Sequence, residues 1–129
     1  MIRIVLVDDE SSVRQGLKMR LELTKEIVVV GETGDGATAL TLIHDLLPDV
    51  VVMDIKLPGH DGITITQTLR AEKVRAAIVI HSMHDDAAMR ECAHAAGALA
   101  FVGKHEGIAA LLSAIRKAAA HAIEIKVQG

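Results

Sequence analysis

Short apolar runs alternate with longer stretches of mixed polarity along this chain. The runs Ile4–Val7 and Val50–Met53 are apolar throughout and are bounded by polar residues. Apolar runs of about four to eight residues are typical of strands that are buried on both faces of a sheet. In the stretches between them, apolar residues recur at a spacing of three or four, as in Val13, Leu17 and Leu21, which indicates amphipathic helices.

This alternation predicts five strands, each followed by a helix. The expected strands are Ile4–Val7, Ile27–Val30, Val50–Met53, Ala77–His81 and Leu99–Val102. The expected helices are Ser11–Leu23, Ala37–Leu47, Ile63–Glu72, Asp86–Ala96 and Ile108–Ala122. Five βα units of this length favour a doubly wound α/β fold, with a five-stranded parallel sheet in the order 2-1-3-4-5 and helices on both faces.

Residues near the helix ends support these boundaries. Ser11 or Ser12 fits the N-cap of the first helix and Asp61 that of the third, because their side-chain oxygens accept hydrogen bonds from unpaired backbone N–H groups. Gly97 fits the position just after the fourth helix, where a left-handed backbone conformation is common. The single cysteine, Cys92, excludes an internal disulfide. It falls at helical spacing with small apolar neighbours, so we expect it to pack as a small hydrophobic side chain.

Composition bounds the class of protein. The 129 residues have the size of one domain, and 50% of them are hydrophobic. We expect one domain over residues 1–122, followed by a C-terminal tail, 123–129, that is either a terminus or the start of a linker to a further domain. No apolar stretch reaches the roughly 18 residues of a membrane span. The net charge of −3 and the single aromatic residue argue against nucleic-acid contact by this segment, and we expect a cytoplasmic protein.

Carboxylates directly follow two of the predicted strands. Asp8 and Asp9 come after the first strand, and Asp54 comes after the third. In the order 2-1-3-4-5 these two strands are neighbours, at the point where the strand order reverses and ligands bind in such sheets. Carboxylates held close together repel one another unless a cation lies among them, and hard oxygen ligands suit Mg²⁺. The sequence therefore predicts a Mg²⁺ site at this edge.

Two further strand ends add chemistry to the same edge. Ser82 follows the fourth strand, and Lys104 follows the fifth. A carboxylate nucleophile, a cation, a hydroxyl group and an ammonium group are together the parts needed to handle a phosphoryl group.

The order of these residues resembles the receiver domain of bacterial two-component response regulators, over essentially the whole chain. The matching elements are Asp8-Asp9, Asp54-Ile-Lys-Leu-Pro58-Gly-His-Asp61-Gly62, Ser82 and Phe101-Val-Gly-Lys104. The run from Ser82 to Asp86 and the last helix resemble in particular the receivers of LuxR-type (NarL/FixJ-like) transcriptional regulators. The resemblance implies the flavodoxin-like fold of that family.

The resemblance also implies roles for the acidic residues. Asp54 is expected to accept a phosphoryl group from a sensor histidine kinase. Asp9 and Asp54 are expected to bind Mg²⁺ directly, together with the backbone carbonyl of Lys56, and Asp8 is expected to act through a bound water.

A switch is implied by the same resemblance. Lys104 and Ser82 are expected to contact the phosphoryl oxygens, and Phe101 to turn inward when Ser82 shifts. The surface of the fourth helix, fifth strand and fifth helix then changes and controls output, with homodimer formation on phosphorylation and DNA contact only through a further output domain. Many receivers have Pro after the lysine. Here the residue is His105, so we expect a trans peptide bond after Lys104.

Alternatives stay open at this point. The chain fits a stand-alone receiver, or a degenerate one that only binds partners. A haloacid-dehalogenase-like phosphohydrolase would need a second Asp two residues after the nucleophile, where this chain has Lys56. In the receiver interpretation the protein catalyses only its own phosphorylation and dephosphorylation, and it is not an enzyme with an independent substrate.

Overall fold

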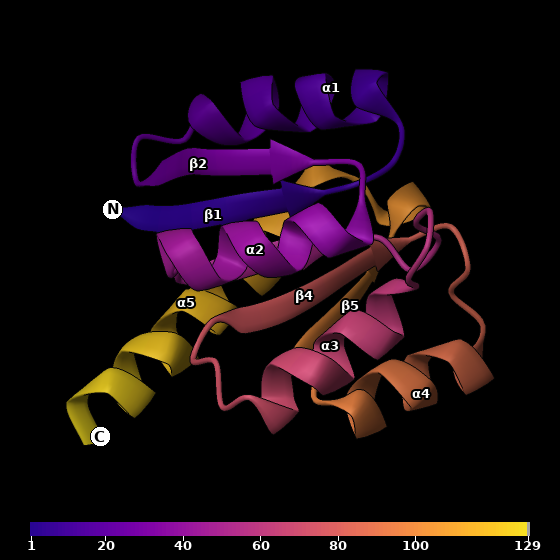
Figure 1. Cartoon of the computed structure of the whole chain (residues 1–129). Coiled ribbons are helices and arrows are strands. Elements are labelled where there is room, and N and C mark those ends of the chain that lie inside the picture. Colours follow the sequence, from indigo (N-terminus) through magenta and orange to yellow (C-terminus); the bar gives the residue numbers. More distant parts are fainter. Residues whose placement is uncertain (129) are drawn as a thin grey trace.

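A computed structural model describes the backbone of residues 1–128 and the side chains of residues 1–122. Strands and helices alternate along the chain as predicted (Figure 1). The strands are β1 (Ile2–Val7), β2 (Ile27–Thr33), β3 (Val50–Met53), β4 (Ala77–Ser82) and β5 (Ala100–Gly103). The helices are α1 (Ser11–Glu22), α2 (Gly36–Leu46), α3 (Gly62–Ala71), α4 (Ala87–Ala96), the short 3₁₀ helix η1 (Lys104–Glu106) and α5 (Ile108–Gln128).

The sheet is parallel throughout and has the order β2-β1-β3-β4-β5, which confirms the predicted fold. Helices α2, α3 and α4 cover one face, and α1 and α5 cover the other (Figure 1). Leu21 of α1 and Ile115 of α5 belong to one core cluster, while Ile43 of α2 and Leu69 of α3 belong to the other. The central strand β3 is buried on both sides, which explains its uninterrupted apolar sequence.

Most element boundaries lie within one or two residues of the prediction, and the larger differences are at the ends of β2 and α5. β2 continues to Thr33, so Gly31 lies in the strand and not in a turn, and the β1–β2 register shifts between Ile4 and Val5. α5 continues to Gln128, because the alanine-rich segment after position 108 meets no Gly or Pro before Gly129. The predicted tail is therefore helical as far as it is described, and its role as a linker stays a prediction.

The predicted helix caps are present in α3 and α4 but not in α1. Asp61 accepts a hydrogen bond from Thr64 N–H at the start of α3, and Gly97 ends α4 with a φ of 109°, so both predictions are confirmed. The capping role predicted for Ser11 or Ser12 is wrong, since both lie inside α1. The N-cap position falls one residue earlier, in a loop that is fixed by the side chain of Asp8.

The prediction for Cys92 is also wrong, because its side chain is exposed. Ala93 and Ala96 take the buried positions of α4, and Cys92 lines a groove between α3 and α4 together with Met89. Adjacent helix positions are rotated by about 100°, so a residue next to the buried stripe lies at its edge.

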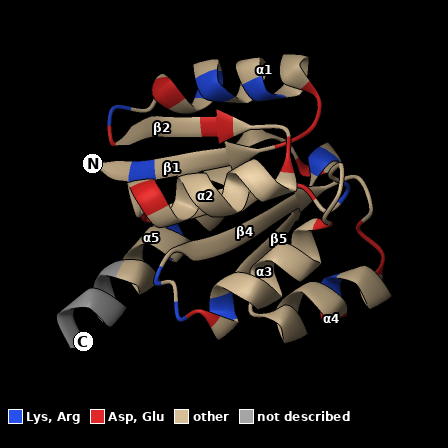
Figure 2. Ribbon diagram, in the orientation of Figure 1, with Lys and Arg blue, Asp and Glu red and all other residues tan. Residues whose placement is uncertain are grey.

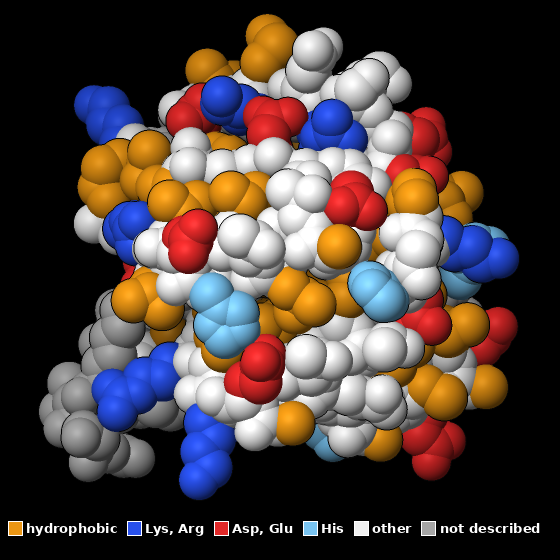
Figure 3. Space-filling view, in the orientation of Figure 1, with side chains coloured by type: hydrophobic (Ala, Val, Ile, Leu, Met, Phe, Trp, Pro, Cys, Tyr) orange, Lys and Arg blue, Asp and Glu red, His pale blue; other side chains and the backbone are white. Residues whose placement is uncertain are grey.

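The surface and the interior are clearly separated. Figure 2 shows β4 and β5 without charged residues, while acidic and basic segments lie on the helices, in loops and on β1 and β2. On the face over α2 and α3, hydrophobic side chains are interspersed with polar and charged ones (Figure 3). Within the part of the chain that is described, no helix is long and apolar enough to cross a membrane.

Candidate functional site

The carboxyl ends of β1 and β3 place three acidic residues side by side. Val7 pairs with Met53 in the sheet, and the N–H of Asp54 donates to the carbonyl oxygen of Val7 at 2.9 Å. This bond continues the pairing for one residue past β3, which brings Asp54 next to Asp8. The predicted convergence of Asp8, Asp9 and Asp54 is therefore confirmed, with one carboxylate oxygen of each within 4.8 Å of the others.

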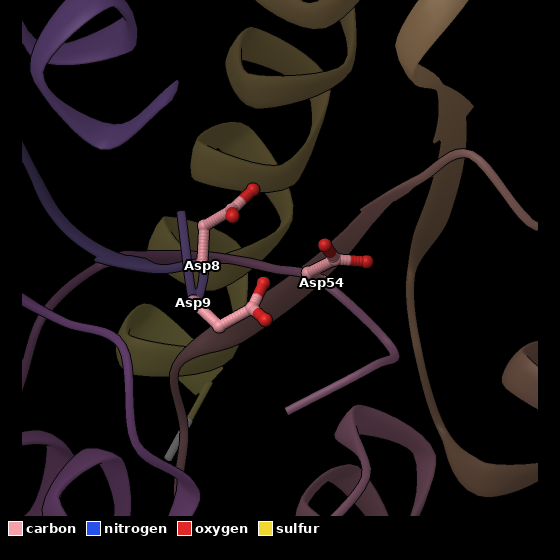
Figure 4. A group of neighbouring side chains, drawn as sticks. All are labelled: Asp8, Asp9 and Asp54. Carbon is pink, nitrogen blue, oxygen red and sulfur yellow. The ribbon is translucent and has the colours of Figure 1, made fainter. Parts of the chain in front are cut away.

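The three carboxylates surround one small space (Figure 4). Asp8 and Asp54 are 3% and 7% exposed, whereas Asp9 is exposed. A cluster of hard oxygen donors with one open side fits a divalent cation such as Mg²⁺, which keeps several of its waters when bound. No histidine joins a group of this kind among the described residues.

Each buried carboxylate divides its two oxygens between a backbone N–H and Lys104. Asp54 Oδ1 accepts from Ile55 N–H at 2.7 Å, and Asp8 Oδ1 accepts from Glu10 N–H at 3.0 Å. The Nζ atom of Lys104 lies 2.9 Å from Asp54 Oδ2 and 2.8 Å from Asp8 Oδ2. The ammonium group therefore bridges the two buried carboxylates and compensates part of their charge.

The environment of Lys104 keeps it protonated. Burial by itself would lower the pKa of the ammonium group, but the hydrogen bonds and charges of Asp8 and Asp54 outweigh burial, so the pKa is raised above its usual value. The side chain is 12% exposed. A fixed positive charge thus stands against the carboxylate of Asp54.

Ser82 and Phe101 share one face of the sheet, on the side of α4. Ile80 pairs with Phe101 and Ser82 pairs with Gly103, so the side chains of Ser82 and Phe101 point to the same side of the sheet. Ser82 is fully buried, and its Oγ accepts from His84 N–H at 3.1 Å. Ser82 is not the cap of α4, because Asp86 fills that position.

The loop after β3 folds back onto Asp54. Gly62 N–H donates to the carbonyl oxygen of Ile55 at 2.7 Å. A Cβ atom on Gly62 would lie 2.1 Å from the carbonyl oxygen of Asp54, so only glycine allows this approach. Lys56 lies in this loop with an exposed side chain, and the metal-binding role of its carbonyl stays a prediction. The peptide bond after Lys104 is trans, as predicted.

Two residues near the site were not identified from the sequence. His81 follows Ile80, the partner of Met53, so it lies beside Asp54 on the same sheet face, and it is 8% exposed with an unpaired Nδ1. Burial, and then the charge of Lys104, lowers the pKa of His81. The guanidinium group of Arg14 donates to the backbone carbonyl of Asp8 and so holds the β1–α1 loop. Neither role has a sequence signal, because the position of His81 depends on strand register and that of Arg14 depends on how the loop between β1 and α1 folds.

Comparisons with known proteins agree on one family. The sequence model of one protein family, the response regulator receiver domain, matches residues 4–116. The transcriptional regulatory protein LiaR of Bacillus subtilis (strain 168) is 40% identical over 119 residues, which cover 92% of this chain and 56% of LiaR. A protein-glutamate methylesterase/protein-glutamine glutaminase of Syntrophomonas wolfei is 36% identical over 124 residues, which cover 95% of this chain and 35% of that protein.

Solved structures give the same result. A LuxR-family two-component response regulator from Aurantimonas sp. SI85-9A1 is 38% identical and superimposes with a TM-score of 0.89, over 93% of this chain and 86% of that one. The chain spans between 35% and 56% of the length of the two curated relatives above.

Proposed function

Because the chain belongs to the response regulator receiver domain family, we propose that Asp54 accepts a phosphoryl group from a sensor histidine kinase and that the modified domain acts as a switch. Phosphorylation and Mg²⁺ are general to this family, and its relatives include transcriptional regulators. What we propose is the assignment of the reaction to particular residues of this chain.

The observation that carries the proposal is the bridge made by Lys104. Its Nζ lies 2.9 Å from a carboxylate oxygen of Asp54, and 2.8 Å from one of Asp8. An ammonium group at this position can stabilise the negative charge of the carboxylate before the reaction and that of the phosphoryl oxygens during transfer.

The reaction forms one bond and breaks another. An oxygen of the Asp54 carboxylate attacks the phosphorus atom of a phosphohistidine, the phosphorus–nitrogen bond breaks, and its electron pair leaves with the imidazole of the kinase, which takes up a proton. The Ile55 N–H holds the other oxygen of Asp54 and so orients the carboxylate. Lys104 then pairs with the phosphoryl oxygens.

Mg²⁺ fits the acidic cluster. Asp9 and Asp54 would hold the ion directly with the backbone carbonyl of Lys56, and Asp8 would hold it through a water. When bound, the ion supplies positive charge that offsets the repulsion between the phosphoryl group and three carboxylates. The mutual distance of at most 4.8 Å between the carboxylate oxygens supports this assignment.

The switch uses two residues that share a face of the sheet. The Ser82 hydroxyl donates to a phosphoryl oxygen and moves towards it, and the half-buried ring of Phe101 turns into the space that opens. These contacts exist only in the phosphorylated form, so they shift the population towards a changed α4–β5–α5 surface.

Partners and location belong to the same proposal. Output is transcriptional, through an output domain outside this segment that contacts DNA, and homodimers form on phosphorylation in the cytoplasm. A relative named as a transcriptional regulatory protein, LiaR at 40% identity, and a LuxR-family structure at 38% support a transcriptional output, while a methylesterase relative at 36% identity leaves that output as the alternative. The domain itself turns over no independent substrate.

Intact-mass spectrometry tests the proposal. Incubation with acetyl phosphate and Mg²⁺ should add one phosphoryl group to the wild type, and none to Asp54→Asn or in the presence of EDTA. Equal labelling of wild type and Asp54→Asn would refute Asp54 as the acceptor. No labelling, under conditions that modify a known receiver and with a histidine kinase as second donor, would favour a degenerate receiver that only binds partners.

A further inference from the structure

The turn that carries Lys104 is closed by a carboxylate. Gly103 precedes Lys104, and Glu106 ends the short helix η1 that follows it. The N–H of Gly103 donates to Glu106 Oε2 at 2.6 Å, which is half of a capping box. The backbone of Lys104 therefore lies inside a loop whose two ends are joined by this hydrogen bond.

Arg90 of α4 holds the same carboxylate from the other side. Its Nη2 lies 3.1 Å from Glu106 Oε2, and its Nη1 donates to the carbonyl oxygen of Phe101 at 3.3 Å. Its Nε donates to the carbonyl oxygen of Asp85 at 3.1 Å. The guanidinium carbon also lies 4.8 Å from the centre of the Phe101 ring. One planar cation thus contacts the β4–α4 loop, β5 and η1 together.

We infer that Arg90 and Glu106 form a clamp, defined by these contacts, that positions Lys104 for phosphoryl transfer to Asp54. This inference rests on the proposed function of the site. Arg90 and Glu106 do not touch the reacting atoms and are positioning residues.

The need for a clamp follows from the chemistry of lysine. Its flexible four-carbon side chain does not by itself fix the ammonium group, so the position of that group depends on the position of the backbone. The peptide bond after Lys104 is trans. The backbone nitrogen of His105 is not part of a ring, so φ at this position is not fixed as it is in proline. In this chain the restriction comes from the Glu106 hydrogen bond and from Arg90. Displacement of a catalytic group by about 1 Å can cost up to about 100-fold in rate.

Two variants weaken the clamp differently. Arg90→Met keeps an aliphatic side chain against Phe101 and removes the guanidinium group. Glu106→Gln keeps an oxygen for Gly103 N–H and removes the charge that faces Arg90. We expect phosphorylation of Asp54 by acetyl phosphate to slow by about tenfold in Arg90→Met and by less in Glu106→Gln. Arg116→Met breaks an ion pair of 2.7 Å with Glu26 elsewhere on the surface and is the matched control, with an unchanged rate.

A second background separates positioning from general damage to the fold. If Arg90 acts through Lys104, the slowing caused by Arg90→Met should disappear when both proteins carry Lys104→Ala. Time courses of intact mass at saturating acetyl phosphate and Mg²⁺ measure all four rates. A wild-type rate in Arg90→Met, or equal slowing in both backgrounds, would overturn the clamp. Absence of labelling in the wild type, with acetyl phosphate and with a histidine kinase as second donor, would instead refute the proposed function, and the clamp with it.

Discussion

Buried polar residues at the carboxyl edge of the sheet differ in whether their side chains have an ion-pair or hydrogen-bond partner. Asp8 and Asp54 are buried but share the ammonium group of Lys104. His81 is buried beside them, and its Nδ1 has no hydrogen-bond partner. Burial and the charge of Lys104 lower the pKa of His81, while the charges of Asp8 and Asp54 oppose this shift. The imidazole is therefore neutral in the folded protein at pH 7.

The lowered pKa of His81 has a consequence for stability. Below about pH 6.5 the imidazole of the unfolded chain takes up a proton that the folded protein binds only at lower pH, so the free energy of unfolding falls as the pH falls. His81→Leu removes this loss of stability at low pH. It also removes the unpaired buried nitrogen, whose burial destabilises the wild type by roughly 1 kcal/mol or more. We expect the variant to be at least as stable as the wild type at pH 8, with an advantage that grows by pH 5.5.

Urea unfolding followed by circular dichroism measures this difference, because the chain has no Trp or Tyr. His94→Gln, at an exposed position of α4, is the control for the removal of a histidine away from the site. A constant difference between wild type and His81→Leu across the pH range would show that His81 titrates normally in the folded state.

Among the structural elements, the β3–α3 loop packs tightly against the site. A Cβ on Gly62 would meet the carbonyl oxygen of Asp54 at 2.1 Å, and backbone atoms cannot move aside cheaply. We expect Gly62→Ala to lower the free energy of unfolding by about 1–3 kcal/mol and to slow phosphorylation of Asp54, because the acceptor itself must shift.

The control for this substitution is another helical glycine. Gly16 lies in α1, and a Cβ atom added there would meet nothing within 4 Å, so Gly16→Ala should stabilise the protein by up to about 1 kcal/mol without changing the phosphorylation rate. Denaturant unfolding measures the free energy of unfolding of both variants, and time courses of labelling measure their phosphorylation rates. A Gly62→Ala protein with wild-type stability would contradict the close approach.

Element identity was predictable because hydrophobic periodicity determines it. β3 was predicted to the residue, since Val50–Met53 is apolar throughout and bounded by Asp49 and Asp54. The exposure of Cys92 was not predicted, because Cys92 lies beside Ala93 at the edge of the buried stripe of α4, where the sequence does not show whether a neighbouring element covers it. The extension of β2 to Thr33 depends on pairing with β1, which no local pattern in the sequence shows.

For the whole molecule, the site exists only when the sheet is formed. Asp8 and Asp9 follow β1 and Asp54 follows β3, and β1–β3 pairing brings these two parts of the chain together. A cation that binds the folded form and not the unfolded chain must therefore stabilise the protein.

Mg²⁺ at about 100 times its dissociation constant should raise the free energy of unfolding by about 2.7 kcal/mol. Unfolding curves in Mg²⁺ and in EDTA measure the effect. Asp9→Asn should reduce it by weakening the site, while Asp45→Asn, which changes an exposed carboxylate of α2, should leave it intact. Stabilisation that is equal in Asp9→Asn and wild type would place the ion elsewhere.

The residues of the site were predictable in part, because the order of the strands in the whole sheet determines which strand ends lie together. The strand order puts the ends of β1, β3, β4 and β5 at one edge, so Asp8, Asp54, Ser82 and Lys104 could be grouped from the sequence. The clamp of Arg90 on Glu106 could not, because it depends on the side-chain position of an arginine 16 residues away. Only the spacing from Gly103 to Glu106 resembles a capping signal, and it lacks the usual Ser or Thr.

The most direct test of Asp54 as the acceptor locates the phosphoryl group in the chain. Protein labelled with acetyl phosphate and Mg²⁺ is reduced with borohydride, which converts an aspartyl phosphate to homoserine, and the peptides are sequenced by mass spectrometry. We predict homoserine at position 54, with Asp8 and Asp9 unchanged. Homoserine at position 8 or 9, with Asp54 intact, would contradict the assignment.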